Sequence, residues 1–187
     1  VEYPSDPIKR LSVRYSCPEW IIRLWKETYD LSLIETMLKD FQTEKPTTIR
    51  RCRSRITMEQ LKKRLEEEHV LVENHPYLKD ALLISKYDYL ESLETFREGL
   101  FVVQDISSML VTEAADPKPG DYVIDLCAAP GGKSLHAADK MQGEGMVDSR
   151  DLTDYKVGLI EENIERTQTM NIRAYRKDAT ILDKDCL

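Results

Sequence analysis

The chain has 187 residues, of which 41% are hydrophobic and 33% are charged, and its formal net charge is −7. This composition argues against wholesale disorder and allows one large domain or two small ones with a buried core. No apolar run approaches the roughly 18 to 20 residues of a membrane span, and the four scattered cysteines form no Cys-x-x-Cys pair, so we expect neither a membrane segment nor a metal site and favour a cytoplasmic setting.

The first half of the chain predicts a helical start and then a small α+β domain. Apolar residues at helical spacing predict a helix over residues 18–41, and Pro46 follows shortly after it. The elements expected next are a strand at 47–53, a helix opened by a capping box at Thr57 and Gln60, strands at 70–72 and 81–85, a helix at 87–96 and a strand at 101–103. This order is typical of a ferredoxin-like sandwich.

The second half predicts a parallel sheet. A helix at 104–115 precedes an alternation of strands and helices. The strands are expected at 122–126, 146–149 and 172–175, with helices at 133–141 and 154–167 between them. Strands that alternate with helices of this length indicate an α/β unit with a parallel sheet.

A bend of small residues joins the first of these strands to the next helix: Cys127, Ala128, Ala129, Pro130, Gly131, Gly132 and Lys133. Small side chains allow a ligand to approach the backbone, and the N-terminus of a helix favours an anionic group. Because ligands of open parallel sheets lie beyond the carboxyl ends of the strands, Asp151 and Asp178 are expected at the same site. Asp151 has the spacing of an acid that binds ribose hydroxyls, and Asp178 could reach an adenine edge.

Two other interpretations of the bend remain open. Gly132-Lys133-Ser134 fits the end of a P-loop, although Cys127 stands where that motif requires its first glycine. The bend could also be an ordinary turn between a strand and a helix. The dinucleotide fingerprint Gly-x-Gly-x-x-Gly is absent.

The ten residues from Asp125 to Ser134, Asp-Leu-Cys-Ala-Ala-Pro-Gly-Gly-Lys-Ser, resemble the first motif of the Nol1/Nop2/Sun RNA (cytosine-C5)-methyltransferases. Residues 99–108 resemble the segment leading into that family's catalytic domain, and residues 11–20 the start of the RNA-binding lobe in its bacterial small-subunit rRNA enzymes. The resemblance implies a ferredoxin- or RRM-like RNA-binding lobe over 1–98. It also implies the first half of a Rossmann-like class I methyltransferase sheet over 99–187.

The resemblance also implies S-adenosylmethionine as cofactor. Residues Cys127 to Lys133 would hold its methionine part, Asp151 its ribose hydroxyls and Asp178 its adenine amino group. The family adds a cysteine thiolate to C6 of cytosine so that C5 can accept the methyl group. Its cysteines lie in Pro-Cys and Thr-Cys motifs, which are absent here. We therefore expect none of Cys17, Cys52, Cys127 and Cys186 to be the nucleophile.

The length of the predicted sheet bears on where the nucleophile lies. Only three of the seven strands of such a sheet are visible, and the chain does not begin with Met. A piece of a longer protein is thus expected, with the nucleophile beyond Leu187.

RNA is the expected partner. Arg51, Arg53 and Arg55 would share one face of the predicted strand and contact phosphates, unless that face is merely solvated. Residues 1–64 hold 14 Lys and Arg against 9 Asp and Glu, so the acidic balance belongs to the rest of the chain. Small-subunit rRNA is the substrate that the resemblance favours. The alternatives are a tRNA cytosine-C5 methyltransferase, a P-loop-like nucleotide-binding protein and a non-enzymatic RNA-binding module.

Overall fold

The computed structural model describes residues 3–183. The chain divides into two compact units, Val1–Lys45 and Pro46–Leu187, which are considered separately below. The boundary expected after Glu98 falls inside the second unit. Among the described residues, no helix is long and apolar enough to cross a membrane.

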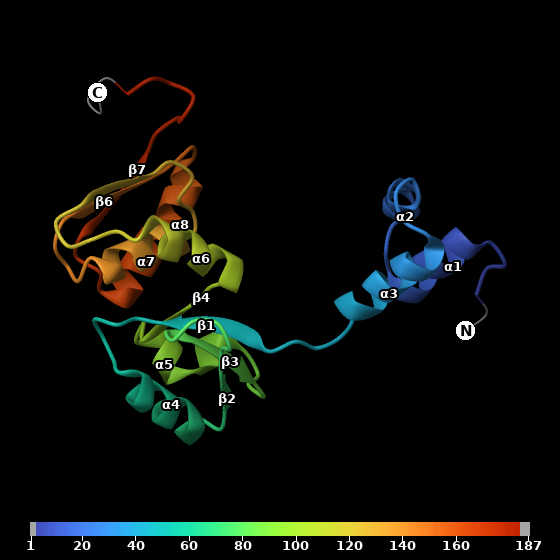
Figure 1. Cartoon of the computed structure of the whole chain (residues 1–187), viewed down its shortest axis with the longest axis horizontal. Coiled ribbons are helices and arrows are strands. Elements are labelled where there is room, and N and C mark those ends of the chain that lie inside the picture. Colours follow the sequence, from blue (N-terminus) through green and yellow to red (C-terminus); the bar gives the residue numbers. More distant parts are fainter. Residues whose placement is uncertain (1–2, 184–187) are drawn as a thin grey trace. The chain divides into compact units, whose positions relative to one another are not determined.

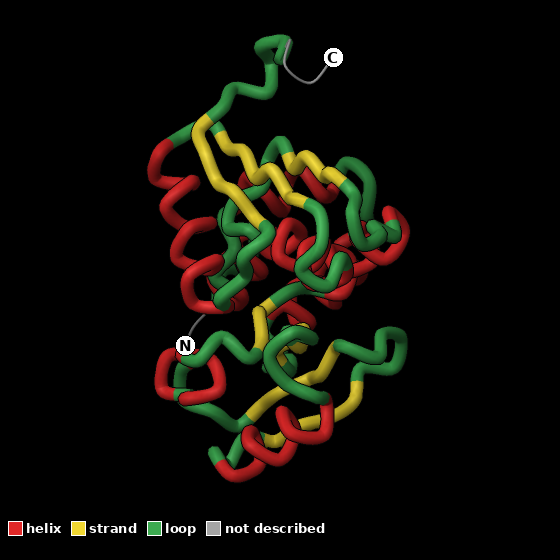
Figure 2. Tube along the Cα trace, turned by 90° about the vertical axis from the view of Figure 1, so that its left-hand side faces the viewer, coloured by secondary structure: helices red, strands yellow, loops and turns green. Residues whose placement is uncertain are grey.

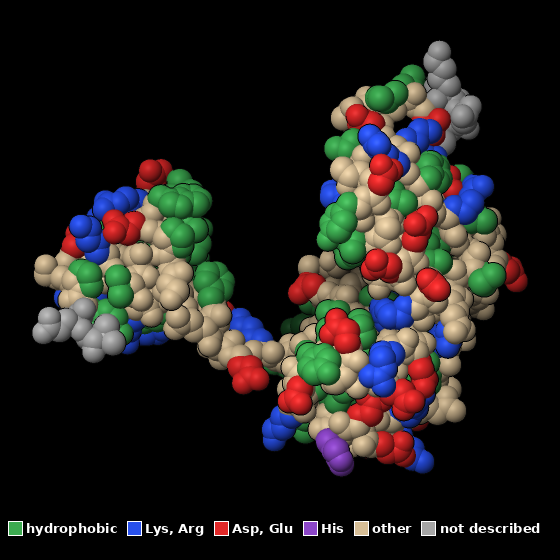
Figure 3. Space-filling model, turned by 180° about the vertical axis from the view of Figure 1, so that it is seen from behind, with side chains coloured by type: hydrophobic (Ala, Val, Ile, Leu, Met, Phe, Trp, Pro, Cys, Tyr) green, Lys and Arg blue, Asp and Glu red, His purple; other side chains and the backbone are tan. Residues whose placement is uncertain are grey.

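The first unit consists of three short helices (Figure 1). They are α1 (Pro7–Tyr15), α2 (Glu19–Lys26) and α3 (Leu31–Phe41). The single helix expected over 18–41 is wrong, because the Asp30 carboxylate accepts a hydrogen bond from the Leu33 amide (2.8 Å) and starts a new helix. The buried core residues are Ile8, Leu11, Tyr15, Ile22, Ile34 and Leu38. Other apolar side chains gather on one side of this unit (Figure 3).

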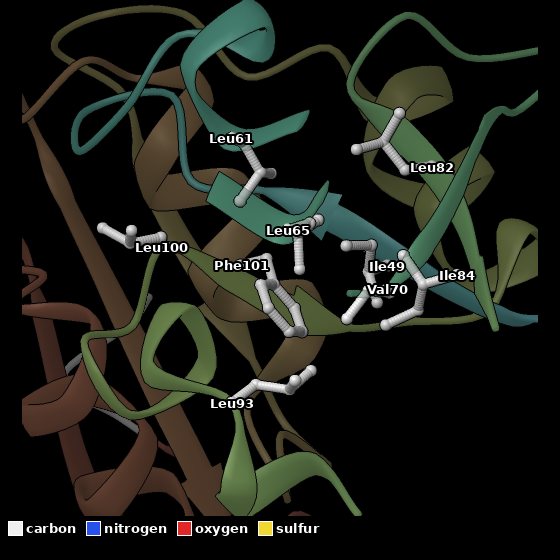
Figure 4. Close-up of a cluster of buried hydrophobic side chains, with 9 residues drawn as sticks. All are labelled: Ile49, Leu61, Leu65, Val70, Leu82, Ile84, Leu93, Leu100 and Phe101. Atoms are coloured by element: carbon white, nitrogen blue, oxygen red, sulfur yellow. The ribbon is translucent and has the colours of Figure 1, made fainter. Parts of the chain in front are cut away.

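The second unit opens with a four-stranded antiparallel sheet in the order β2-β3-β1-β4. Its elements are β1 (Thr47–Arg51), α4 (Met58–Glu67), β2 (Leu71–Asn74), β3 (Ala81–Ser85), the 3-10 turn η1 (Leu90–Ser92), α5 (Glu94–Arg97) and β4 (Phe101–Val103). This order confirms the ferredoxin-like prediction, and the capping box of Thr57 and Gln60 is present. Figure 4 shows the apolar side chains between the sheet and its helices, including Leu61, Leu65 and Phe101.

A three-stranded parallel sheet follows, in the order β5-β6-β7. Its elements are α6 (Ile106–Ala115), β5 (Tyr122–Asp125), α7 (Gly132–Lys140), β6 (Met146–Asp151), α8 (Asp154–Thr167) and β7 (Ile172–Arg176). Figure 2 shows the three strands side by side, with the chain continuing beyond β7 toward the C-terminus. The prediction of strands alternating with helices is confirmed.

The two sheets of the second unit share one core around α7. Val102 of β4 and Cys52, which directly follows β1, pack with Leu135 and Met141 from the α7 region. The buried Arg50 donates to Asp139 on α7 (3.1 Å) and to Gln104 (2.8 Å). The antiparallel sheet therefore helps to fix α7, whose first turn forms part of the candidate site.

Candidate cofactor-binding site

The bend after β5 is held by hydrogen bonds at both ends. The Asp125 carboxylate accepts from the buried Ser134 hydroxyl (2.8 Å), which ties the end of β5 to α7. The Ala128 amide donates to the Arg150 carbonyl (3.0 Å), which ties the bend to β6. Gly131 has a φ of +104°, a conformation that side chains disfavour, and its position lies against Ile160. These contacts give the bend one defined shape.

The first turn of α7 is a candidate anion site. Gly131 is the N-cap residue and supplies no side-chain hydrogen bond, so the first amides of α7 lack a side-chain cap. Lys133 is exposed in this turn and, within residues 3–183, has no ion pair. A cavity of about 200 Å³ lies beside the bend, between Ala128 to Lys133 and the segment that precedes α6. The turn thus offers free N–H groups, a positive dipole end and an ammonium group to a carboxylate.

Asp151 is the last residue of β6, and its side chain is only 5% exposed. Its carboxylate accepts from the Leu152 amide (2.8 Å) and the Ala129 amide (3.0 Å), and it lies 3.1 Å from the Lys156 ammonium. Burial by itself raises the pKa of Asp151, but these hydrogen bonds outweigh it and hold the pKa below its usual value. The Asp151 carboxylate is therefore an ionised acceptor in direct contact with the bend.

Asp178 follows β7 and lines a cavity of about 320 Å³ together with Ile124 and Leu126. Its carboxylate accepts from the amide (2.9 Å) and the hydroxyl (2.7 Å) of Thr180, which lower its pKa. The Lys177 amide donates to the Asp151 carbonyl (2.9 Å), so the chain leaves β7 alongside the end of β6. Asp125, Asp151 and Asp178 consequently stand at or just beyond the carboxyl ends of three adjacent parallel strands.

These residues fit the parts of S-adenosylmethionine. The cofactor combines a carboxylate, a ribose diol and an adenine ring. An uncapped helix N-terminus suits the carboxylate, and an ionised buried acid suits the ribose diol. Asp178, which lies beside apolar side chains, suits the adenine ring.

The arginines expected to bind RNA do not share a strand face. β1 ends at Arg51, and the Arg55 amide donates to the Cys52 carbonyl (3.0 Å), so residues 52–55 form a turn. Arg51 and Arg53 both contact the Asp80 carboxylate, with the two Nε atoms at 3.0 and 2.7 Å. Arg55 donates to the Thr167 carbonyl (3.2 Å). The predicted geometry is wrong because a turn replaces the strand, and each arginine has a partner within the chain.

The described cysteines differ in their surroundings. Cys52 is buried in the core that both sheets share, and burial raises the pKa of its thiol to about 11. Burial also raises the pKa of Cys17. Cys127 is exposed in the bend. Cys186 lies outside the described residues.

A buried polar network on the parallel sheet was not predicted. Arg150 is 4% exposed and donates to Tyr175 (2.7 Å), Asp183 (2.8 Å) and Asp148 (3.3 Å). Tyr122 also donates to Asp148. The signal in the sequence was the alternation of Asp148 and Arg150 within an otherwise ordinary strand, which places both charges on one face.

Two family profiles match this chain. The profile described as the ferredoxin-like domain of RsmF/B-like methyltransferases matches residues 17–90, and the profile described as 16S rRNA methyltransferase RsmB/F matches residues 112–187. The chain belongs to the RsmB/F methyltransferase family. The resemblance seen in the sequence is thereby confirmed.

Named relatives and a solved structure agree with this assignment. The probable ribosomal RNA small subunit methyltransferase B of Bacillus subtilis (strain 168) is 35% identical over 175 residues, which is 94% of this chain and 39% of the relative. The tRNA (cytosine(72)-C(5))-methyltransferase of Pyrococcus horikoshii is 34% identical over 94 residues, 50% of this chain and 24% of the relative. The crystal structure of PH0851 has a TM-score of 0.82 at 27% identity and covers 95% of this chain and 41% of its own. This chain thus spans less than half the length of each of these three proteins.

Proposed function

We propose that this chain is the ferredoxin-like and cofactor-binding part of an S-adenosylmethionine-dependent RNA (cytosine-C5)-methyltransferase. The observation that carries the proposal is that three aspartates stand at or just beyond the carboxyl ends of β5, β6 and β7. Two of them, Asp125 and Asp151, also bond to Ser134 of α7 and to the Ala129 amide of the bend. A parallel sheet binds its ligand at this edge. The names of the relatives supply the reaction.

Each of these groups has a role in holding the cofactor. The first amides of α7 and Lys133 bind its carboxylate, Asp151 binds the ribose hydroxyls, and Asp178 accepts from the adenine amino group. The cofactor, when bound, supplies a methyl group on a positively charged sulfur. The buried Cys52 thiol, with its raised pKa, is unsuited to attack cytosine, and Cys127 belongs to the cofactor bend. We therefore assign the role of nucleophile to neither of these two cysteines.

Small-subunit rRNA is the proposed substrate, because the Bacillus subtilis relative matches 94% of this chain and carries that name. A tRNA is the second candidate, supported by the shorter match to the Pyrococcus horikoshii enzyme. A cytoplasmic location is proposed with it, since Cys17, Cys52 and Cys127 are all free thiols.

The test is calorimetric titration of the chain with S-adenosylmethionine. Removing the Asp151 carboxylate, in Asp151→Ala, should weaken binding at least about tenfold, which corresponds to about 1.4 kcal/mol. Asp154→Ala is the matched control, because Asp154 lies three residues away with a side chain that is 83% exposed. Equal affinity of wild type and Asp151→Ala would refute the assigned role. Binding of ATP without binding of S-adenosylmethionine would favour the P-loop interpretation instead.

A further inference from the structure

The ferredoxin-like part carries a groove that the proposed cofactor site does not use. Its outer part is a cavity of about 890 Å³ between the first turns of α4, which include Lys62, and the loop from β2 to β3. An inner cavity of about 260 Å³ continues from it past Tyr77 and Lys79 to Arg50 and His136. Both cavities lie within the second unit. The outer volume is in the range of small-ligand sites.

The loop from β2 to β3 holds an aromatic ring out into this groove. Tyr77 is 80% exposed, and its ring lies 5.6 Å from that of His75. The loop is anchored at its base, where the His75 amide donates to the Ala81 carbonyl (3.2 Å) and Asp80 binds the β1 arginines. A large, exposed ring on an anchored loop is costly to leave in water. It is also the usual platform for stacking an unpaired base.

The free positive charges of the groove are lysines, not the arginines of β1. Arg51 and Arg53 both form ion pairs with Asp80, so their charges are already partnered within the protein. Within residues 3–183, by contrast, no acidic side chain lies within ion-pair distance of Lys62 or Lys79, and both line the outer cavity. These two ammonium groups are therefore available to phosphates.

The inner cavity adds one hydrogen-bond donor and one acceptor. Arg50 Nη2 and His136 Nδ1 are buried and have no hydrogen-bond partner within the described part of the chain. His136 Nε2 lies 3.1 Å from Glu113 Oε1, so the imidazole proton lies on Nε2 and Nδ1 is an acceptor. One donor and one acceptor lining the same cavity match a ribose hydroxyl or a base edge better than a bare anion.

We infer that this groove binds a nucleotide segment of single-stranded RNA, with a base stacked on Tyr77 and the flanking phosphates on Lys62 and Lys79. This inference rests on the proposed function, since it assigns the RNA-binding side chains of the same protein. A single strand is specified because a base presents its face to an aromatic ring only when it is unpaired. The arginines predicted from the sequence would then support the loop rather than contact RNA.

The test is fluorescence anisotropy of the chain with a short fluorescein-labelled single-stranded RNA, measured over a range of salt concentrations. Tyr77→Ala should weaken binding about fivefold or more at every salt concentration, because stacking is independent of salt. The double variant Lys62→Ala/Lys79→Ala should lower the slope of log affinity against log salt by about 1.4.

Matched controls separate the groove from the rest of the surface. Tyr89→Ala removes another exposed tyrosine. Lys63→Ala removes a lysine that is next to Lys62 in the sequence but already pairs with Glu67. Neither should change the affinity more than twofold. The inference is overturned if wild type binds RNA and the Tyr77 and lysine variants bind equally well, or if the controls weaken binding as much. A wild-type chain that binds S-adenosylmethionine but no RNA at low salt would also overturn this inference while leaving the cofactor-binding proposal intact. A chain that fails to bind S-adenosylmethionine would overturn the proposed function.

Discussion

The ion pair between Arg50 and Asp139 should be a main determinant of stability in the second unit. Its charged atoms lie 3.1 Å apart, and the two side chains are 1% and 7% exposed. In Asp139→Ala the Arg50 guanidinium would stay buried without a counter-ion. Removing one partner of a buried pair typically costs about 3 to 5 kcal/mol. The variant would also remove the acceptor of the Arg53 and Ser54 amides, but these donors are near the surface and water can replace the carboxylate.

Urea unfolding followed by far-UV circular dichroism measures this loss. Trp20 and Trp25 both lie in the first unit, so tryptophan fluorescence follows that unit and provides an internal reference that should not move. The dichroism transition should shift to lower urea by the amount that corresponds to about 3 to 5 kcal/mol.

Two further variants make the reasoning refutable. Replacing both partners, in Arg50→Met/Asp139→Leu, removes the buried charges together and should recover most of the stability lost in Asp139→Ala. Asp154→Ala breaks an exposed pair and should change stability by less than about 1 kcal/mol. An Asp139→Ala protein within about 1 kcal/mol of wild type would show that Arg50 is not an uncompensated buried charge.

Two other predictions follow from the packing of the second unit. Gly99→Ala should be strongly destabilising, because a Cβ there would lie 1.9 Å from the Arg166 carbonyl oxygen. Gly120 also has a positive φ, but a Cβ there would meet open space, so Gly120→Ala should cost only about 1 kcal/mol in thermal or urea unfolding. Burial, followed by the charges of Arg50 and Lys140, lowers the pKa of His136 to about 3. Its folded pKa is thus below the unfolded value of about 6.5, so the neutral ring stabilises the fold fully above that value and progressively less as the pH falls toward 3. NMR should show no titration of His136 between pH 7.5 and 4.5, and a midpoint near 6 would contradict its burial.

Local pattern determined most of the secondary structure of this chain. Helix α8 was expected over 154–167, and the structure has it at Asp154–Thr167, because Thr153 caps it and Val157, Ile160 and Ile164 repeat at helical spacing. The bend from Cys127 to Lys133 and the positions of Asp151 and Asp178 at strand ends were also predictable. They depend on residues adjacent in sequence and on the rule that parallel strands end at one edge.

Tertiary structure alone decided which charged side chains form ion pairs with one another inside the protein. Nothing within a few residues of Arg51 and Arg53 indicates that Asp80, in the loop from β2 to β3, forms ion pairs with both of them. Arg50 is likewise directed to Asp139, 89 residues further along the chain. Hydrophobic periodicity reports which face of an element is buried, but an ion pair depends on two side chains brought together by the fold. That is why the bend after β5 and the strand ends were predictable from the sequence, whereas the lack of ion-pair partners for Lys62 and Lys79 within residues 3–183 emerged only from the packed structure.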